Sequence, residues 1–164
     1  MTVPALFGLS IIMSFVASGI VAWLFLWPWL RGKPRDDALV PLLVPHAFRF
    51  IGLSFLVPGV VSPTLSPAFA APAAYGDLIA AVLALAALLG LRARAIWALP
   101  LIWLFNLWGT ADLLNAYYQG ALGARINPGA LGAAFFIPTV IVPPLLIIHG
   151  LIFRLLLRGA STQI

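Results

Sequence analysis

Long runs of apolar residues, separated by short polar stretches, fill almost the whole chain. A helix needs about 20 mostly apolar residues to cross the hydrocarbon core of a bilayer. Five runs meet or approach this length: Pro4–Leu30, Ala38–Val61, Ala74–Leu91, Ile96–Tyr118 and Ala133–Leu157. The pattern therefore predicts an all-α integral membrane bundle of about five transmembrane helices, with residues 1–164 forming a single domain.

The composition supports the same class. Of the 164 residues, 63% are hydrophobic and 8% are charged, and the mean hydropathy is +1.12. An ordinary soluble domain has about 25% charged residues, and a chain this short cannot bury so much apolar surface in a water-facing fold. The lipid bilayer is therefore the first expected partner. The absence of cysteine excludes disulfides and thiolate metal ligands, and no other metal site is predicted.

The basic residues predict the orientation. In a five-span arrangement, one side holds Arg31, Lys33, Arg35, Arg92, Arg94, Arg154 and Arg158. Only Arg125 falls on the other side. Because loops rich in Lys and Arg stay in the cytoplasm, we expect the N-terminus outside and the C-terminus inside, in a bacterial inner membrane. This distribution explains the net charge of +5 without a nucleic-acid partner.

Arg49 lies near the middle of the second apolar run. A charged residue at that depth costs about 2.5–3.5 kcal/mol on insertion scales and usually has a partner. Counting along straight helices places Asp77 and Asp112 on one side of Arg49, and His46 and His149 on the other. Because an unpaired buried charge is costly, we expect Arg49 to pair with the two carboxylates.

The fourth apolar run carries a polar stripe. Helical spacing puts Trp108, Asp112, Asn115 and Gln119 on one face, and Asn106 and Thr110 on another. In lipid such a stripe must face the bundle interior or a water-filled cavity. The candidate polar core or ligand-binding set is Arg49, His46, Asp77, Asp112, Asn115, Asn106, Trp108 and His149.

Prolines and small residues mark two further features. Ser62–Pro72 contains three prolines, which predicts an irregular segment, either a plain connection or a lid. In the fifth run, Pro138, Pro143 and Pro144 are expected to free the carbonyls of Ala134, Thr139 and Val140. Gly76, Ala80, Ala84 and Ala87 form a stripe that allows close helix packing.

The two histidines leave several interpretations open. His46 and His149, at similar depth, could be axial ligands of a b-type haem, bind a metal ion or relay protons. They could also simply be satisfied by hydrogen bonds. The chain has no Ser/His/Asp order, HExxH, P-loop or dinucleotide motif, so the sequence gives no support for an enzyme.

Three short motifs resemble the DoxX-like small membrane proteins: Phe48–Gly59, Ala73–Leu78 and Leu89–Arg94. The resemblance covers the second to fourth runs. It implies a helical bundle that serves as an accessory subunit of a redox or quinone-linked complex. The chain departs from that pattern at Asp77, where Glu is usual, and by its additional first run and its lack of cysteine.

The sequence leaves three functions open. The first is a non-enzymatic module that binds or transports a small polar or amphipathic ligand, held between Arg49, Asp77, Asp112 and Asn115 and capped by Ser62–Pro72. The second is a structural or accessory subunit in a homo-oligomer or a larger membrane complex. The third is the haem protein.

Overall fold

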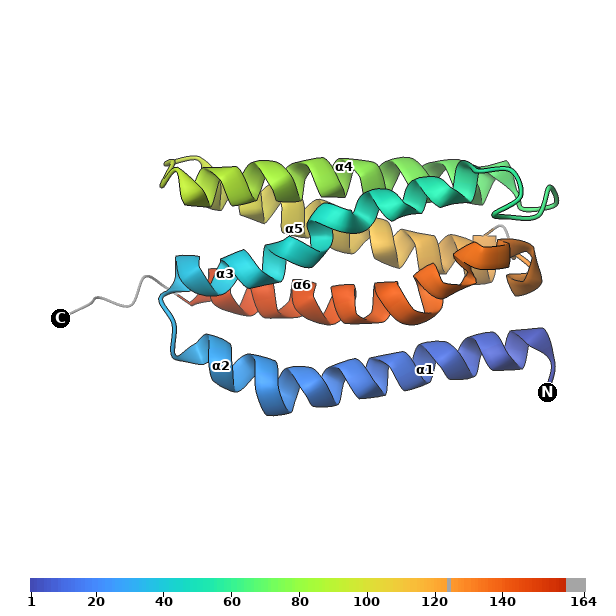
Figure 1. Ribbon diagram of the computed structural model, residues 1–164, viewed down its shortest axis with the longest axis horizontal. Coiled ribbons are helices and arrows are strands. Elements are labelled where there is room, and N and C mark those ends of the chain that lie inside the picture. Colours follow the sequence, from blue (N-terminus) through green and yellow to red (C-terminus); the bar gives the residue numbers. More distant parts are fainter. Residues whose placement is uncertain (124, 159–164) are drawn as a thin grey trace.

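The computed structural model describes residues 1–123 and 125–158, which are mostly helical (Figure 1). The first half comprises α1 (Val3–Val21), η1 (Ala22–Leu26), α2 (Trp27–Arg31), α3 (Arg35–Leu43) and η2 (Val44–Leu56). The second half comprises α4 (Pro67–Arg92), α5 (Ala98–Tyr118), η3 (Gln119–Gly123), η4 (Pro128–Phe135), η5 (Ile137–Ile141) and α6 (Val142–Leu157).

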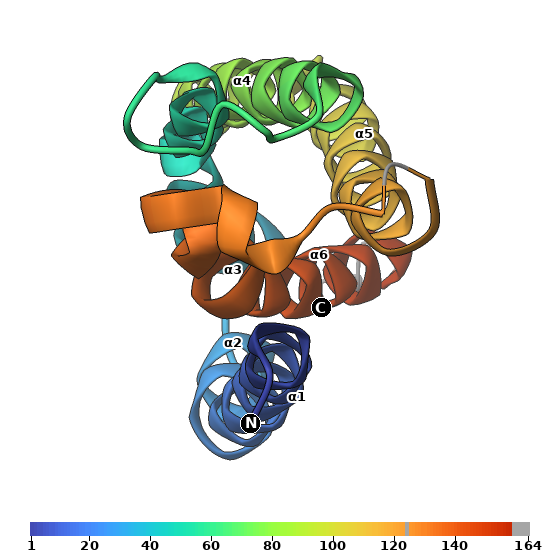
Figure 2. The same ribbon diagram turned by 90° about the vertical axis from the view of Figure 1, so that its right-hand side faces the viewer.

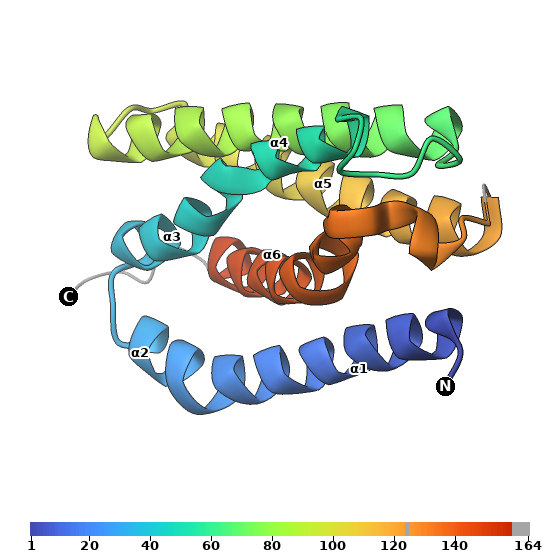
Figure 3. The ribbon, with the colours of Figure 1, turned by 45° about the vertical axis from the view of Figure 1, so that its right-hand side comes forward.

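The helices form a ring with one helix outside it. Seen end-on, α3 with η2, α4, α5 and α6 surround a common axis, while α1 and α2 lie beside α6 (Figure 2). No residue of α1 is buried. The helix formed by α3 and η2 runs obliquely, so that α3 packs against α6 and η2 packs against α4 (Figure 3). This crossing carries Arg49 into the centre of the ring.

Four helices among the described residues are long and apolar enough to cross a membrane. They are Val3–Arg31, Arg35–Leu56, Pro67–Arg92 and Ile137–Leu157. The predicted all-helical bundle is therefore confirmed, and several of its helices could cross a membrane. The helix α5, at 21 residues, runs alongside them but does not belong to this apolar set (Figure 1).

The helix α4 begins earlier than its predicted start at Ala74. The prediction that all of Ser62–Pro72 is irregular was therefore wrong for its second half. The helix starts at Pro67 and includes Pro72. Proline suits the first helical position because the N–H that it lacks would have no helical partner there. Between η2 and α4, residues 57–66 are non-helical, and this loop is held by the hydrogen bond from the Ser62 N–H to the Ala130 carbonyl, 2.9 Å long.

The segment η2 is a 3₁₀ helix of 13 residues, which is unusually long. A 3₁₀ helix has 3.0 residues per turn, so side chains at i and i+3 lie directly above one another. The buried residues of η2 follow this period: His46, Arg49, Gly52 and Phe55. The 3₁₀ geometry therefore keeps both polar side chains on the line that faces the ring.

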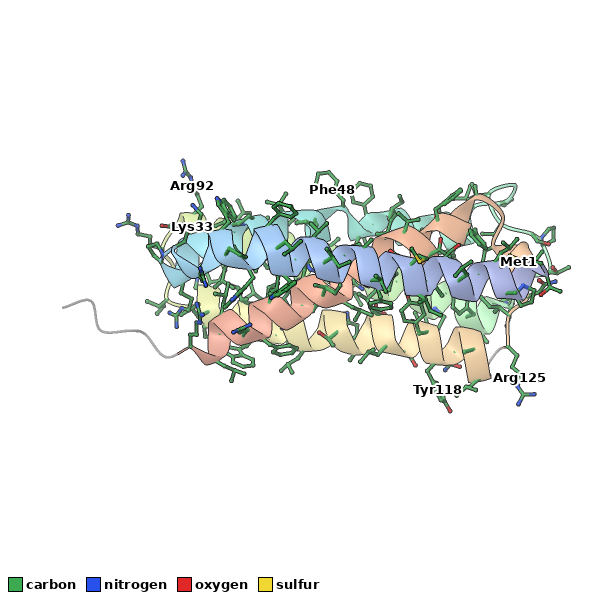
Figure 4. The ribbon with its side chains drawn as sticks, turned by 90° about the horizontal axis from the view of Figure 1, so that it is seen from below. Met1, Lys33, Phe48, Arg92, Tyr118 and Arg125 are labelled. Carbon is green, nitrogen blue, oxygen red and sulfur yellow. The ribbon has the colours of Figure 1, made fainter. Side chains whose placement is uncertain are left out.

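The bundle has two chemically different ends. Lys33 and Arg92 project at the basic end, whereas Met1, Tyr118 and Arg125 lie towards the other end, which we call the N-terminal end (Figure 4). At the basic end the guanidinium of Arg154 lies 3.8 Å from the centre of the Trp27 ring, a cation–π distance.

Two apolar clusters fill the bundle, one on each side of Arg49. The basic-end cluster contains fully enclosed side chains, including Leu39, Leu43, Ile102 and Ile152. The predicted small-residue stripe is confirmed, since Ala80, Ala84 and Ala87 in this cluster have no exposed surface. The N-terminal-end cluster is built around Phe55, Phe69, Leu113 and Leu131.

The prolines of the fifth run produce the irregular helix η4–η5 ahead of α6. The Ala134 carbonyl, which was expected to be free, accepts the N–H of Phe136, so that prediction was wrong. Instead, the Tyr117 hydroxyl donates to the Pro138 carbonyl (2.7 Å) and the Thr139 hydroxyl donates to the Phe135 carbonyl (2.7 Å). Side chains thus satisfy backbone groups that lipid could not.

Candidate functional site

Arg49 is the centre of a buried ion-paired cluster. Its side chain is 1% exposed. Nε donates to Asp77 Oδ1 over 2.7 Å, and Nη2 donates to Asp112 Oδ2 over 2.6 Å. The predicted pairing of Arg49 with both carboxylates is therefore present, and it joins η2, α4 and α5.

The same guanidinium reaches a fourth helix through His149. Arg49 Nη1 donates to the Gly109 carbonyl over 3.3 Å and lies 3.4 Å from His149 Nε2. His149 Nδ1 lies 2.7 Å from Asn106 Oδ1, while Asn106 Nδ2 donates to the His149 carbonyl over 3.2 Å. Because Asn106 Oδ1 can only accept, these bonds assign the proton to Nδ1 and leave Nε2 as the acceptor for Arg49. His149 is thus neutral in this network.

Three glycines make room for the cluster. A Cβ atom on Gly52 would overlap the Asp77 carboxylate, and one on Gly76 would overlap the Asp112 carboxylate. A Cβ atom on Gly109 would lie 2.8 Å from Arg49 Nη1. The helix backbones approach one another at these positions because the glycines have no side chains, and the charged groups fill the space.

His46 lies on the basic side of Arg49 and does not join its hydrogen bonds. It is fully buried, and neither ring nitrogen has a partner among the described residues. Its ring centre lies 4.2 Å from that of His149 and 5.0 Å from that of Phe105.

This packing does not fit the haem interpretation. Two axial imidazoles must point at one iron from opposite faces of the porphyrin. His46 and His149 instead contact each other directly with their rings inclined by 46°, and both are closed off, at 0% and 1% exposed. A macrocycle cannot lie between them, so we discard His46 and His149 as haem ligands.

A cavity of about 420 Å³ opens beside the cluster, towards the N-terminal end. This volume lies within the range of small-molecule pockets. Asp77 and Asp112 line its inner end. Most of its wall is apolar and aromatic, and includes Phe7, Ile11, Phe55, Phe69, Ala116 and Tyr117.

A second hollow of about 410 Å³ lies between α4 and α5. Trp108 and Asn115, expected in the polar core, are exposed and line this hollow together with Asp112. The Trp108 indole donates to the Gly76 carbonyl over 3.3 Å. Trp108 and Asn115 therefore face the α4–α5 surface rather than the ring, whereas Asn106, on the other face of α5, occupies the interior. Asp112 borders both hollows.

Several cavity residues were not predicted. Phe7 and Ile11 of α1, and Tyr117 of α5, carry no polar signal that distinguishes them from other apolar membrane residues. The predicted lid also differs. The cavity wall includes Gly120, Ile126 and Pro128. Ser62, Pro63 and Leu65 instead line a separate hollow with the start of α4.

The fold and the cluster define a helical protein with an ion-paired core and with several helices that are long and apolar enough to cross a membrane. The chain belongs to the family described as "Domain of unknown function (DUF8737)", which matches residues 6–157. No curated protein and no solved structure matches the chain. Nothing in these comparisons links it to the DoxX-like proteins.

Proposed function

We propose that this chain is a membrane protein that binds a small amphipathic molecule in the cavity next to Arg49. The observation that carries the proposal is the composition of the cavity wall. Two carboxylates, Asp77 and Asp112, meet at one end of an otherwise largely apolar space of about 420 Å³. Binding sites for small molecules commonly combine apolar walls with a few converging polar groups.

The membrane arrangement that we propose has five spans, with α5 as the fourth. Three polar residues, Asp112, Asn106 and Asn115, lower the hydropathy of α5. Within the ring, however, Asp112 is bonded to Arg49, and the buried Asn106 is bonded to the His149 carbonyl. The basic end would lie in the cytoplasm, because Lys and Arg are retained there. The cavity would then open to the outer side of a bacterial inner membrane.

A purely structural role for the polar cluster is the alternative. Such a role requires only that the charged side chains hold the helices together. Side chains with this role alone are expected to be fully buried, as His46 is. The Asp112 side chain is instead 11% exposed and the Asp77 side chain 8% exposed, and both border the cavity. These exposures favour a site that a second molecule reaches.

Binding is better supported than transport in this conformation. The enclosed side chains of the basic-end cluster, among them Leu39, Leu43 and Ile102, lie between the polar cluster and the basic end. A solute in the cavity would meet this apolar layer. We therefore propose a site open at one end.

Filling the cavity tests the proposal. Ala116 lines the cavity, so Ala116→Trp is expected to abolish saturable binding of octanol, a simple amphipathic probe, because the indole occupies the ligand's space. Titration of the purified protein in dodecyl maltoside micelles, followed by native mass spectrometry, measures the bound probe.

The matched control is Ala17→Trp, at an exposed position of α1 away from the cavity. It is expected to bind octanol as the unmodified protein does. Equal binding by the Ala116→Trp and Ala17→Trp proteins, or no saturable binding by the unmodified protein, would rule out the proposed site.

A further inference from the structure

The cluster beside the cavity has an unbalanced charge. Arg49 contributes one positive charge, while Asp77 and Asp112 contribute two negative charges. His149 is neutral because Nδ1 donates to Asn106 and Nε2 accepts from Arg49. With both carboxylates ionised, the formal sum is one negative charge in a site shielded from water on most sides.

Two carboxylate oxygens of the cluster carry no hydrogen bond among the described residues. The three guanidinium nitrogens of Arg49 all bond within the cluster. Each carboxylate accepts from Arg49 through one oxygen, Oδ1 in Asp77 and Oδ2 in Asp112. No donor among the described residues reaches the second oxygen of either group. These oxygens, Asp77 Oδ2 and Asp112 Oδ1, lie next to Gly52 and Gly76, and they belong to side chains that line the cavity.

Among the described residues, no basic side chain besides Arg49 is ion-paired with Asp77 or Asp112. Arg125 is the other charged residue of the cavity wall, but it lies at the rim and its side chain points away from the bundle (Figure 4). Lys33 and Arg92 project at the opposite end of the molecule (Figure 4). A buried charge without a partner is strongly unfavourable in low dielectric, so the site favours a positive group that enters through the cavity.

We propose that the ligand of this cavity carries a positively charged ammonium group on an apolar body. The ammonium group lies against Asp77 and Asp112, and the apolar body contacts Phe55, Phe69 and Tyr117 along the wall. This inference rests on the proposed binding function and adds the charge of the head group. An ammonium group can come from a free amine or from the head group of an amine-containing lipid.

Three probes of equal chain length test the head group. Octylammonium, octanol and octanoate differ in charge but not in apolar body. Titrated into the unmodified protein in dodecyl maltoside micelles, octylammonium is expected to bind about tenfold more tightly than octanol, equivalent to about 1.4 kcal/mol. Octanoate is expected to bind more weakly than octanol, because it adds a second excess negative charge. The Ala116→Trp protein, whose cavity is filled, measures how much of each probe is taken up by the micelle alone, and this amount is subtracted.

Removing one carboxylate charge gives the matched variant. Asp112→Asn keeps an oxygen that can accept from Arg49 Nη2 but brings the formal sum of the cluster to zero. It is expected to lose the preference for octylammonium, so that octylammonium and octanol bind this protein about equally well. Asp77→Asn removes the other carboxylate charge and serves as a second variant if the Asp112→Asn protein does not fold. The comparison of the three probes in the unmodified protein does not depend on either variant.

The outcomes separate the two proposals. If octanol binds as tightly as octylammonium in the unmodified protein, the cluster neutralises its charge by itself, and the ammonium proposal is overturned while the binding site stands. Tighter binding of octanoate overturns it too, as does an unchanged octylammonium preference in the Asp112→Asn protein. If no probe binds saturably, the proposed function itself fails.

Competition identifies the source of the ammonium group. Dihexanoyl phosphatidylethanolamine should displace octylammonium if a lipid head group is the natural ligand, and dihexanoyl phosphatidylglycerol should not. If neither lipid displaces octylammonium, the ligand is a free amine. Displacement by the glycerol lipid alone would contradict an ammonium site.

Discussion

Replacing Arg49 with methionine is expected to destabilise the folded protein by about 3–5 kcal/mol, the range found when one partner of a buried ion pair is removed. The cause is electrostatic, because two carboxylates, Asp77 and Asp112, would remain close together without the guanidinium that bonds both. Unfolding of the purified protein in mixed micelles of increasing dodecyl sulfate content, followed by circular dichroism, measures this loss.

Two further variants isolate the cause. Arg92→Met, at an exposed position of the basic end, removes the same charge and is expected to change stability by less than about 0.5 kcal/mol. Adding Asp77→Asn and Asp112→Asn to Arg49→Met should restore most of the lost stability, because the triple variant leaves no buried charge. Equal stability of the Arg49→Met and Arg92→Met proteins would mean that the cluster does not hold the helices together.

Replacing Gly76 with alanine is expected to give the second large effect, a loss of about 1–3 kcal/mol, as in other overpacked interiors. The new Cβ atom would overlap the Asp112 carboxylate. That carboxylate would have to move away from Arg49 Nη2, to which it is bonded over 2.6 Å. Thermal unfolding in detergent, followed by circular dichroism, measures the change.

Gly150 offers a matched control in α6, since a Cβ atom there would meet nothing within 4 Å. Gly150→Ala is expected to leave stability unchanged or raise it by about 0.5–1 kcal/mol, because alanine restricts the unfolded chain more than glycine does. If both alanine variants were equally stable, the close approach of α4 and α5 at Gly76 would not matter for the fold.

The ion pairs at Arg49 could be predicted from the sequence, because the prediction depends only on how deep each charged residue lies within its apolar run. A charge in the middle of an apolar run requires a partner, and Asp77 and Asp112 are the acidic residues that lie within other runs. The same reasoning fails for the faces of α5. Helical spacing groups Trp108 with Asn115, but it does not say whether their stripe faces the ring or the α4–α5 surface.

Two other features depend on contacts that local patterns do not encode. The 3₁₀ geometry of Val44–Leu56 aligns His46 with Arg49, yet the sequence in this segment fits an α-helix as well. The cavity wall comes from distant parts of the chain, including Phe7, Phe69 and Tyr117. Each is an ordinary apolar or aromatic membrane residue, so only the packed structure shows that they share one space.

If the proposed site is correct, the cavity is open to water at the N-terminal end and closed at the basic end. Because the chain has no cysteine, single cysteines can report this directly. Ala116→Cys lies in the cavity wall, Ile102→Cys in the enclosed basic-end cluster, and Lys33→Cys at the exposed basic end.

The most direct measurement is the reaction of these cysteines with a membrane-impermeant, positively charged methanethiosulfonate reagent, in right-side-out and in inverted vesicles. We expect the cysteine at position 116 to react only in right-side-out vesicles and the one at 33 only in inverted vesicles. The cysteine at 102 is expected to react in neither. A cysteine at 116 that stays as unreactive as the one at 102 in both preparations would contradict the open cavity.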